Sequence, residues 1–281
     1  MRVLVTGALG QVGVELVEAF TAGGHEVVAT GRPQLDVADR DSVLQAICSV
    51  EPDAVVHAAA WTDVDGCELD PPRALQVNAL GTRHVAEGAR LVGARVCYLS
   101  TDYVFAGDAT APYTEWDPPD PRSAYGRSKL GGERELGPGA TIVRTSWVCG
   151  RHGRNFIRSI LTAAGDRGEV AVVDDQHGCP TFADELASMI VRLVVCRLPG
   201  TFHVTNQGAT TWYGLACAAM VAAGLDPARV RPVATADLSP PRPAPRPAWS
   251  VLDNTALRFS GIPLLADFHE PLQRLVKHIN T

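Results

Sequence analysis

The sequence predicts an α/β fold with a doubly wound parallel sheet and a smaller C-terminal α/β lobe. Over the first half of the chain, short apolar runs alternate with stretches of helical periodicity, which is typical of a parallel sheet covered by helices on both faces. The first apolar run leads directly into three evenly spaced glycines, Gly7, Gly10 and Gly13. A chain of 281 residues has room for one such core and a smaller lobe. Together these observations favour a Rossmann-type fold.

The composition excludes several classes of protein. With 46% hydrophobic and 20% charged residues it is that of an ordinary globular chain, and a net charge of −6 without a basic block argues against a nucleic-acid partner. No apolar run approaches the roughly 20 residues of a membrane span, so we expect a cytoplasmic protein without a membrane partner. Most of the seven cysteines, including Cys48 and Cys196, lie in apolar runs that predict buried, reduced thiols; Cys149 and Cys179 are the candidates for reactivity.

The glycines point to a nucleotide. A strand at 2–6 is followed by the glycine turn and then by a helix to about Ala22. Glycines allow a tight turn and a close approach of the backbone to a pyrophosphate, which then sits on the positive end of the helix. We therefore expect Gly7, Gly10 and Gly13 to bind a dinucleotide.

The second strand, at 26–30, indicates which dinucleotide. It ends without the acidic residue that binds an adenosine ribose 2′-hydroxyl, and Arg32 follows instead. A guanidinium suits a 2′-phosphate, which favours NADPH over NADH, although NADH remains possible. The alternative is that Arg32 is a solvated loop residue. Asp36 and Val37, just before a helix to about Val50, are placed to border the adenine.

The next segments predict where the nicotinamide end lies. A strand at 54–60 runs into small residues, as expected where a cofactor lies against a strand end, and a long helix from about Pro72 to Leu91 follows. A further strand at 96–99 ends at Ser100 and Thr101.

A candidate catalytic group comes next. Tyr125 and Lys129 begin a helix to about Leu136, and residues four apart share one helical face. A phenol with an ordinary pKa of about 10 needs a nearby cation to act at neutral pH, and Lys129 can supply that charge. The hydroxyl of Thr101 can reach the same reacting oxygen. A solvated surface pair is the alternative, but the preceding strand and the nucleotide signals oppose it. Thr101, Tyr125 and Lys129 resemble the catalytic triad of the short-chain dehydrogenase/reductase superfamily.

The remaining elements predict the second lobe. After a strand at 140–143 the chain leaves the sheet near Val148. The expected elements that follow are a helix at 152–164, a strand at 170–173, a loop at 175–181, a helix at 182–196, a strand at 201–204, and helices at 211–223 and 267–279. We expect a nucleotide domain at 1–147 plus about 182–205, and a substrate lobe at about 148–181 and 206–281. In the proline-dense segment 240–247, stiffly held arginines, Arg246 above all, suit a phosphate or diphosphate of the substrate.

Seven segments resemble the dTDP-4-dehydrorhamnose reductase family in sequence and in order. They are GQVG at 10–13, AAWTDVD at 59–65, STDYVF at 100–105, YGRSKLGGE at 125–133, RTSWV at 144–148, DDQHGCPT at 174–181 and RPAWS at 246–250. The resemblance implies an oxidoreductase that uses NADPH to reduce the C4 ketone of a dTDP-4-keto-6-deoxyhexose in deoxysugar biosynthesis. A homodimer is compatible with it, and Mg²⁺ is possible although no feature of the sequence supports a metal site.

The resemblance also implies roles for single residues. Tyr125 becomes the proton donor, Lys129 holds the nicotinamide ribose, and Asn78 supports Lys129. The sugar is contacted by Thr101, Asp102 and Trp147. The residues expected to line the cofactor are Gly10, Gln11, Val12, Asp36, Val37, Ala60, Trp61, Thr62 and Leu99.

Three departures from the family pattern leave the hexulose and its C4 stereochemistry open. They are Cys149 after Trp-Val, His177 after Asp-Gln, and the pair Gly66 and Cys67 after Val-Asp.

Two other functions are weighed. A nucleotide-sugar epimerase or 4,6-dehydratase holds NAD tightly, which fits Arg32 poorly, and a dehydratase needs an acidic pair where Asp102 is followed by Tyr103. The second alternative is a non-catalytic subunit that resembles the regulatory subunit of methionine adenosyltransferase. Such a subunit does not need Thr101, Tyr125 and Lys129, so the presence of all three argues against it.

Overall fold

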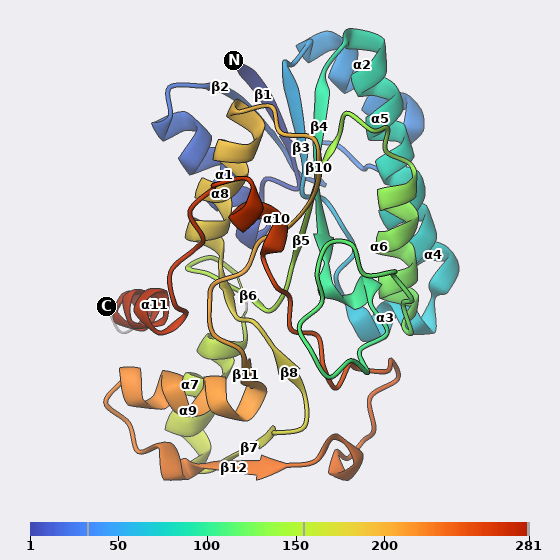
Figure 1. The fold of residues 1–281 in the computed structure, drawn as a ribbon. Coiled ribbons are helices and arrows are strands. Elements are labelled where there is room, and N and C mark those ends of the chain that lie inside the picture. Colours follow the sequence, from blue (N-terminus) through green and yellow to red (C-terminus); the bar gives the residue numbers. More distant parts are fainter. Residues whose placement is uncertain (33, 154, 280–281) are drawn as a thin grey trace.

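A six-stranded parallel sheet forms the core of the larger part of the molecule (Figure 1). The computed structural model describes residues 1–32, 34–153 and 155–279. The strand order is β10-β5-β4-β3-β1-β2, so the chain runs outward from β1 in both directions. The strands are β1 (Arg2–Thr6), β2 (Glu26–Thr30), β3 (Ala54–His57), β4 (Arg95–Thr101), β5 (Thr141–Thr145) and β10 (Gly200–His203). The predicted doubly wound α/β sheet is confirmed, and its direction reverses between β1 and β3, where such sheets bind their ligands.

Helices cover both faces of this sheet because its strands are apolar on both sides. One face carries α1 (Gln11–Ala22) and α8 (Ala183–Val195); the other carries α2 (Arg40–Val50), α5 (Gly81–Val92) and α6 (Ala124–Arg134). In β1 the alternation is direct: Val3 and Val5 pack with α1 and α8, whereas Leu4 packs with α2 and α5. Helix α2 begins where Asp39 accepts a hydrogen bond from Ser42 N.

The long helix expected from about Pro72 to Leu91 is interrupted. It consists of α4 (Pro71–Leu75), a π-helical turn η1 (Gln76–Leu80) and α5, and a short helix α3 (Val64–Leu69) precedes it. A π turn widens the helix locally and is often found at functional sites. Here the turn carries Asn78. Composition did not reveal it, because Gln76–Leu80 reads as ordinary helical sequence.

A smaller lobe lies below the carboxyl ends of the sheet strands (Figure 1). Its helices are α7 (Phe156–Arg167) and α9 (Trp212–Ala222). Its strands are β6 (Val148–Cys149), β7 (Val170–Val173), β8 (His177–Gly178), β9 (Thr181–Phe182), β11 (Thr210–Thr211) and β12 (Val230–Val233), paired two by two. The helix expected from His152 begins instead at Phe156, where Asn155 accepts a hydrogen bond from Arg158 N. The expected loop at 175–181 contains β8 and the start of β9. The division into two domains at the expected boundaries stays a prediction.

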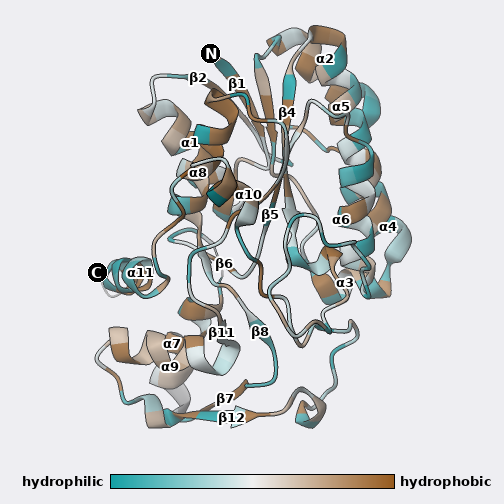
Figure 2. Cartoon of the chain, viewed as in Figure 1, coloured by the Kyte–Doolittle hydropathy of each residue, from teal (hydrophilic) through white to brown (hydrophobic). Residues whose placement is uncertain are grey.

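Short helical segments complete the described part of the chain. They are the 3₁₀ turns η2 (Asp102–Val104), η3 (Pro227–Arg229) and η4 (Thr235–Asp237), and the α-helices α10 (Thr255–Phe259) and α11 (His269–Ile279). The apolar stripe expected on the C-terminal helix is buried: Leu272, Leu275 and Val276 pack with α9. Brown segments in Figure 2 follow the inward faces of the helices, as this packing requires.

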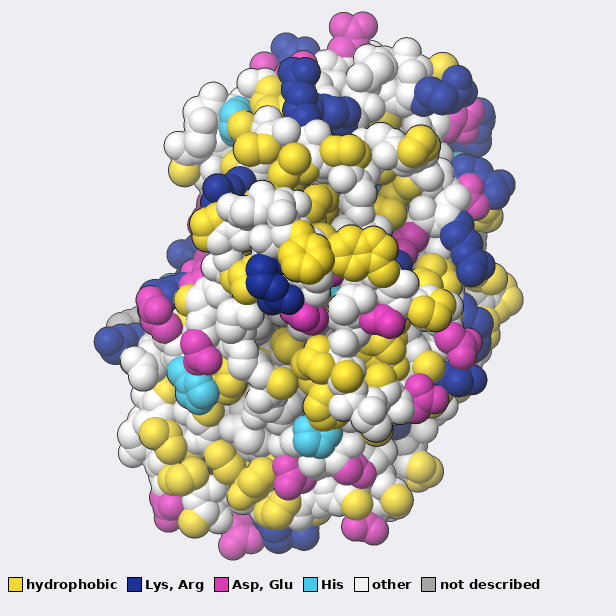
Figure 3. Space-filling model, in the orientation of Figure 1, with side chains coloured by type: hydrophobic (Ala, Val, Ile, Leu, Met, Phe, Trp, Pro, Cys, Tyr) yellow, Lys and Arg dark blue, Asp and Glu magenta, His cyan; other side chains and the backbone are white. Residues whose placement is uncertain are grey.

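The surface of the described residues carries both charged and apolar side chains (Figure 3). No described helix combines the length and the hydrophobicity that crossing a bilayer requires. Figure 3 shows hydrophobic side chains gathered near the middle of one face, with charges of both signs around them. The exposed apolar side chains include Trp116 and Phe259, whose rings lie 6.3 Å apart. The expectation of burial was wrong for Cys48 and Cys196, which are exposed at the outer end of α2 and just after α8.

Candidate active site

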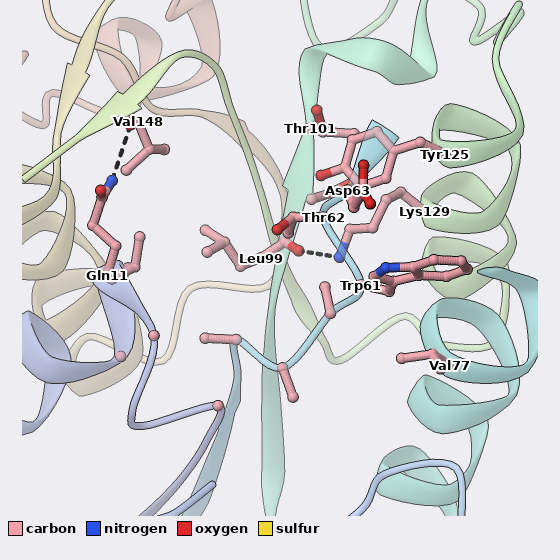
Figure 4. Close-up of a pocket in the computed structure, with 18 of the residues that line it drawn as sticks. Gln11, Trp61, Thr62, Asp63, Val77, Leu99, Thr101, Tyr125, Lys129 and Val148 are labelled. Atoms are coloured by element: carbon pink, nitrogen blue, oxygen red, sulfur yellow. Dashed lines mark hydrogen bonds between the residues drawn. The ribbon is translucent and has the colours of Figure 1, made fainter. Parts of the chain in front are cut away.

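A cavity of about 860 Å³ opens at the carboxyl ends of β1, β3, β4 and β5 and extends toward the smaller lobe. Every residue for which the sequence predicts a catalytic, cofactor or substrate role lines it, except Arg246. Figure 4 shows ten of the lining residues by name, with Gln11 and Val148 on one side and Tyr125 and Lys129 on the other. Residues far apart in the sequence therefore share one chamber, as a dinucleotide and a second substrate require.

The glycine turn forms a cradle that side chains cannot enter. Gly7 has a φ of 70°, and a Cβ there would lie 2.6 Å from Ala59 N. A Cβ on Gly13 would collide with the backbone of the same turn. Helix α1 starts at Gln11 with no side chain capping its first N–H groups. An uncapped helix start with bare backbone around it fits a pyrophosphate.

The far end of the cavity is lined by Arg32, Asp36 and Val37. Arg32 follows β2 and is exposed, so its guanidinium is free to approach an anionic group. Gly31 lies so close to Leu9 that a Cβ there would be 2.6 Å from the Leu9 side chain. Gly31 and Leu9 both line the cavity beside Arg32.

Lys129 lies at the other end, on α6, and is only 2% exposed. Its ammonium donates a hydrogen bond of 2.6 Å to Leu99 O, drawn as a dashed line in Figure 4. Burial lowers the pKa of Lys129 to about 7, and the negative charge of Glu133 opposes that change. Near neutral pH, Lys129 therefore gains or loses its proton with little change in free energy. Such shifted pKa values are common at functional sites.

Glu133 belongs to a buried network behind Lys129. Its carboxylate accepts two hydrogen bonds from Arg144, at 2.9 and 2.7 Å, and one of 2.5 Å from Ser100 Oγ. The side chains of the ion pair are each 6% exposed. Because Glu133 is on α6, Arg144 on β5 and Ser100 on β4, the network fixes the helix that carries Tyr125 and Lys129 against the strand that carries Thr101.

Tyr125 and Thr101 face each other across the cavity wall. Burial raises the pKa of the Tyr125 phenol above its usual value, and a hydrogen bond with the Thr101 side chain opposes this. Tyr125 is 9% exposed and its ring packs edge-on against Tyr103, with ring centroids 5.6 Å apart. Thr101, Tyr125 and Lys129 all line the cavity, whereas the predicted meeting of their polar groups at one reacting oxygen stays a prediction.

Asp102 is 2% exposed and follows Thr101 directly. Thr101 Oγ1 donates to Asp102 Oδ1 over 3.0 Å, while Oδ2 is buried without a hydrogen-bond partner among the described residues. Burial raises the pKa of Asp102 to about 6, and the side chains of Ser250 and Thr101 oppose this change. A buried, unsatisfied carboxylate oxygen at a cavity wall can accept a hydrogen bond from a ligand hydroxyl.

Among the described residues, the hydrogen bonds of the Asn78 side chain go to Trp61 and Ser128. The support for Lys129 that the family resemblance implies stays a prediction. The Asn78 side-chain oxygen accepts from Trp61 N at 2.7 Å, and its amide donates to Trp61 O at 3.0 Å and to Ser128 Oγ at 2.9 Å. The π turn thus fixes the loop after β3, and with it the cavity residue Trp61. Asn78 can act on Lys129 only indirectly, through Ser128 of the same helix.

Trp212 is a cavity residue that the sequence did not reveal. Its ring stacks on that of Trp147 with centroids 3.7 Å apart and an interplanar angle of 9°. Trp147 has a φ of 47°, and Gly178 packs against its indole so closely that a Cβ would lie 2.5 Å from the ring. The stack gives the cavity a flat aromatic surface. The sequence hinted at this role only by placing an aromatic residue directly after Thr211, the cap of α9.

Arg246 is placed differently from the expectation. It is not among the described residues that line the cavity, and its guanidinium donates to Asp65 Oδ2 at 2.8 Å. Arg242 contacts the same oxygen at 3.3 Å, and Ala244 N donates to the other at 3.1 Å. The proline-dense segment is thereby pinned to α3, so a phosphate contact by Arg246 requires that it share or leave Asp65. Its substrate role stays a prediction.

The positions that depart from the family pattern lie outside the lining of the cavity. Cys149 is 1% exposed and His177 packs beside Trp249, with ring centroids 5.3 Å apart. Burial raises the pKa of Cys149 to about 12 and that of Cys179 to about 11, which opposes the thiolate form that reactivity needs. In the described ranges, no group of three or more His, Cys, Asp or Glu side chains is arranged to hold a metal ion.

Comparison with known proteins identifies the family. The family model described as the RmlD substrate binding domain matches residues 1–281. A dTDP-4-dehydrorhamnose reductase of Streptomyces griseus is 44% identical over 93% of this chain and 88% of its own, and a probable dTDP-4,6-dihydroxy-2-methyloxan-3-one 4-ketoreductase of Streptomyces antibioticus is 42% identical over 97% and 94%. The crystal structure of dTDP-4-dehydrorhamnose reductase from Bacillus anthracis in complex with NADP superposes with a TM-score of 0.94 at 36% identity, covering 100% of this chain and 99% of that one. The chain belongs to the dTDP-4-dehydrorhamnose reductase family.

Proposed function

We propose that the protein uses NADPH to reduce the C4 ketone of a dTDP-4-keto-6-deoxyhexose. The observation that carries the proposal is the convergence of Thr101, Tyr125 and Lys129 at one end of the cavity whose other end is the glycine cradle. Relatives named as reductases of such sugars, and a neighbour that binds NADP, support the same reaction.

The residues of the cradle fit the cofactor. The uncapped start of α1 and the bare backbone of Gly7 and Gly13 would hold the pyrophosphate, and exposed Arg32 would pair with the 2′-phosphate. Lys129 would hold the nicotinamide ribose. When bound, the cofactor supplies the hydride.

The protein supplies the proton and the electrostatic stabilisation. As negative charge develops on the C4 oxygen, Tyr125 would donate its phenolic proton. Thr101 would donate a hydrogen bond to the same oxygen once its hydroxyl turns away from Asp102 Oδ1, to which it donates in this structure. The phenolate that remains would be stabilised by the positive charge of Lys129, four residues further along α6. The unpartnered Oδ2 of Asp102 would accept a hydrogen bond from a sugar hydroxyl, and the Trp147–Trp212 stack would lie along the apolar face of the sugar.

The test follows NADPH absorbance while dTDP-4-keto-6-deoxy sugars are generated in place by a dehydratase, with and without an epimerase. Oxidation that depends on the epimerase identifies the L-lyxo ketosugar as substrate. Oxidation without it retains the reaction and assigns the D-xylo ketosugar. If neither sugar is reduced although NADPH binds, the proposed function is wrong. Purified protein that retains NAD through gel filtration would instead favour an epimerase or dehydratase.

A further inference from the structure

Tyr98 lies in β4 next to the catalytic lysine, and its side chain is fully buried. The Nζ atom of Lys129 is 4.0 Å from the centroid of the Tyr98 ring. A cation at this distance is attracted to the negative face of an aromatic ring, and the attraction is strongest where water is excluded. Tyr98 does not line the cavity, so its ring acts on the site only through Lys129.

Lys129 has few other partners for its charge. An ammonium carries three N–H donors, yet among the described residues its one hydrogen-bond acceptor is Leu99 O. Glu133, whose negative charge acts on Lys129, already binds Arg144 through both carboxylate oxygens and also accepts from Ser100. Because Arg144 offsets much of the charge of Glu133, that carboxylate stabilises the ammonium less than a free one would.

We propose that Tyr98 is a positioning residue for the reaction: its aromatic face holds the Lys129 ammonium in place and stabilises its positive charge. The inference rests on the proposed function for its catalytic meaning, because a charged Lys129 is what makes Tyr125 a proton donor. The cation–π contact itself is a property of the protein alone.

The ring of Tyr98 is held rigidly by its surroundings. It stacks on His57, with ring centroids 5.6 Å apart, and the Tyr98 hydroxyl points at the backbone carbonyls of Asn78 and Lys129, at 3.5 and 3.4 Å. Gly132 makes this approach possible, since a Cβ there would collide with the hydroxyl. The ring therefore cannot turn away from Lys129 without unpacking α6.

Most of the other titratable groups near Lys129 are neutral, so they do not mask the effect of the Tyr98 ring on the Lys129 pKa. Burial lowers the pKa of His57 to about 3, so it is neutral at working pH and adds no second positive charge. Its Nδ1 is hydrogen-bonded with Thr6 Oγ1 at 2.7 Å. Tyr125, on the same helix as Lys129, is neutral because burial raises its pKa. Glu133 is the charged group that opposes the effect of burial on Lys129.

The sequence permits a direct measurement, because it contains two lysines, Lys129 and Lys277. Protein labelled with ¹³C-lysine gives one NMR signal for each, and exposed Lys277 on α11 is an internal reference. The pKa of Lys129 is read from its Cε shift in the absence of substrate. The variants are Tyr98→Phe and its mono-, di- and trifluorinated phenylalanine analogues, which keep the shape of the ring while weakening its negative face.

We expect Tyr98→Phe to leave the pKa of Lys129 near its native value. Each added fluorine should lower it, by about one pH unit in total, since a desolvated cation–π contact is of that order. The pKa of Lys277 should not move, and the same analogues at Phe20, buried on the opposite face of the sheet, should have no effect on Lys129. The basic limb of the kcat–pH profile should shift downward with the pKa, because only charged Lys129 supports Tyr125.

An unchanged pKa across the fluorine series overturns the inference, whatever the activity. A shifted pKa in a protein that reduces no ketosugar retains the cation–π contact and rejects the proposed function instead. A shifted pKa with an unshifted kcat profile would show that Lys129 does not act through its charge, and this too would reject the positioning role.

Discussion

The two walls of the cavity are built in different ways. One wall consists of the carboxyl ends of β1, β3 and β4 and the start of α6, so its polar groups lie on or beside long, regular elements of the core. The opposite wall contains Trp147, next to the two-residue strand β6, and Trp212 at the first turn of α9. The first wall carries the groups that we propose to handle protons, whereas the second presents a flat aromatic surface.

The difference shows how each wall keeps its geometry. Tyr125 and Lys129 are four residues apart on α6, and the buried Arg144–Glu133 pair joins that helix to β5. Trp147 depends instead on its left-handed backbone conformation and on its stack with Trp212. It also depends on Gly178, because any larger residue there would collide with the indole ring. Changes in the first wall should therefore affect chemistry and folding, and changes in the second should affect which sugar is bound.

The largest effect is expected from Tyr125→Phe in the first wall. Losing the proton donor should lower kcat by about 10²–10⁴-fold, because positioned proton transfer is worth that much, while the Kd of NADPH stays nearly native. Single-turnover NADPH oxidation measures the first quantity and fluorescence titration the second. Tyr213→Phe, on α9 and outside the cavity lining, is the matched control with no loss. Near-native turnover by Tyr125→Phe would remove the chemical role of this wall.

Glu133→Gln tests whether the same wall depends on its buried ion pair. The change leaves Arg144 charged and buried without its partner, which typically costs about 3–5 kcal/mol in the free energy of unfolding. Urea denaturation measures this loss. Glu135→Gln is the control, because its partner Arg83 is 57% exposed and such surface pairs contribute at most about 1 kcal/mol. Equal losses in the two variants would mean that the buried pair gives no special support.

The sequence predicts the first wall well because its geometry is mostly local. A spacing of four on a helix brings Tyr125 and Lys129 together whatever surrounds them, and strand ends of a parallel sheet meet at one edge. The glycine turn is equally local, since close backbone packing at Gly7 follows from the residue itself. The confirmed parts of the fold, the parallel sheet and its covering helices, follow from the same short-range periodicity.

The second wall could not be predicted in the same way. The Trp147–Trp212 stack joins residues far apart in sequence, and a left-handed conformation at a tryptophan has no local signal. The pairing of Arg246 with Asp65 spans 181 positions, so the arginine that was expected to bind a phosphate is paired with a carboxylate instead. The π turn at Asn78 likewise depends on the contact that this side chain makes with Trp61.

Arg32→Ala examines the far end of the first wall, where the cofactor is chosen. Removing a guanidinium that pairs with the 2′-phosphate should weaken NADPH by about 10–100-fold, since hydrogen bonds to charged groups contribute about 1.5–3 kcal/mol. NADH lacks that phosphate, so its Kd should change little. Titrating both cofactors against the native protein and Arg32→Ala measures the ratio. Equal weakening of both would assign Arg32 a general role at the adenine end and leave the preference for NADPH unexplained.

Gly178→Ala is the most delicate probe, because it alters the second wall through a single methyl group. The new Cβ would lie 2.5 Å from the Trp147 indole, so the ring must move and its stack with Trp212 must shift. Overpacking of this kind costs about 1–3 kcal/mol, and we expect the KM for the ketosugar to rise about tenfold. The kcat and the Kd of NADPH should stay nearly native, since Tyr125, Lys129 and the glycine turn are untouched. Gly165→Ala in α7, where a Cβ meets nothing within 4 Å, is the matched control. A loss in kcat without a change in KM would show that the aromatic wall takes part in the chemistry, and the separation of roles between the two walls would then fail.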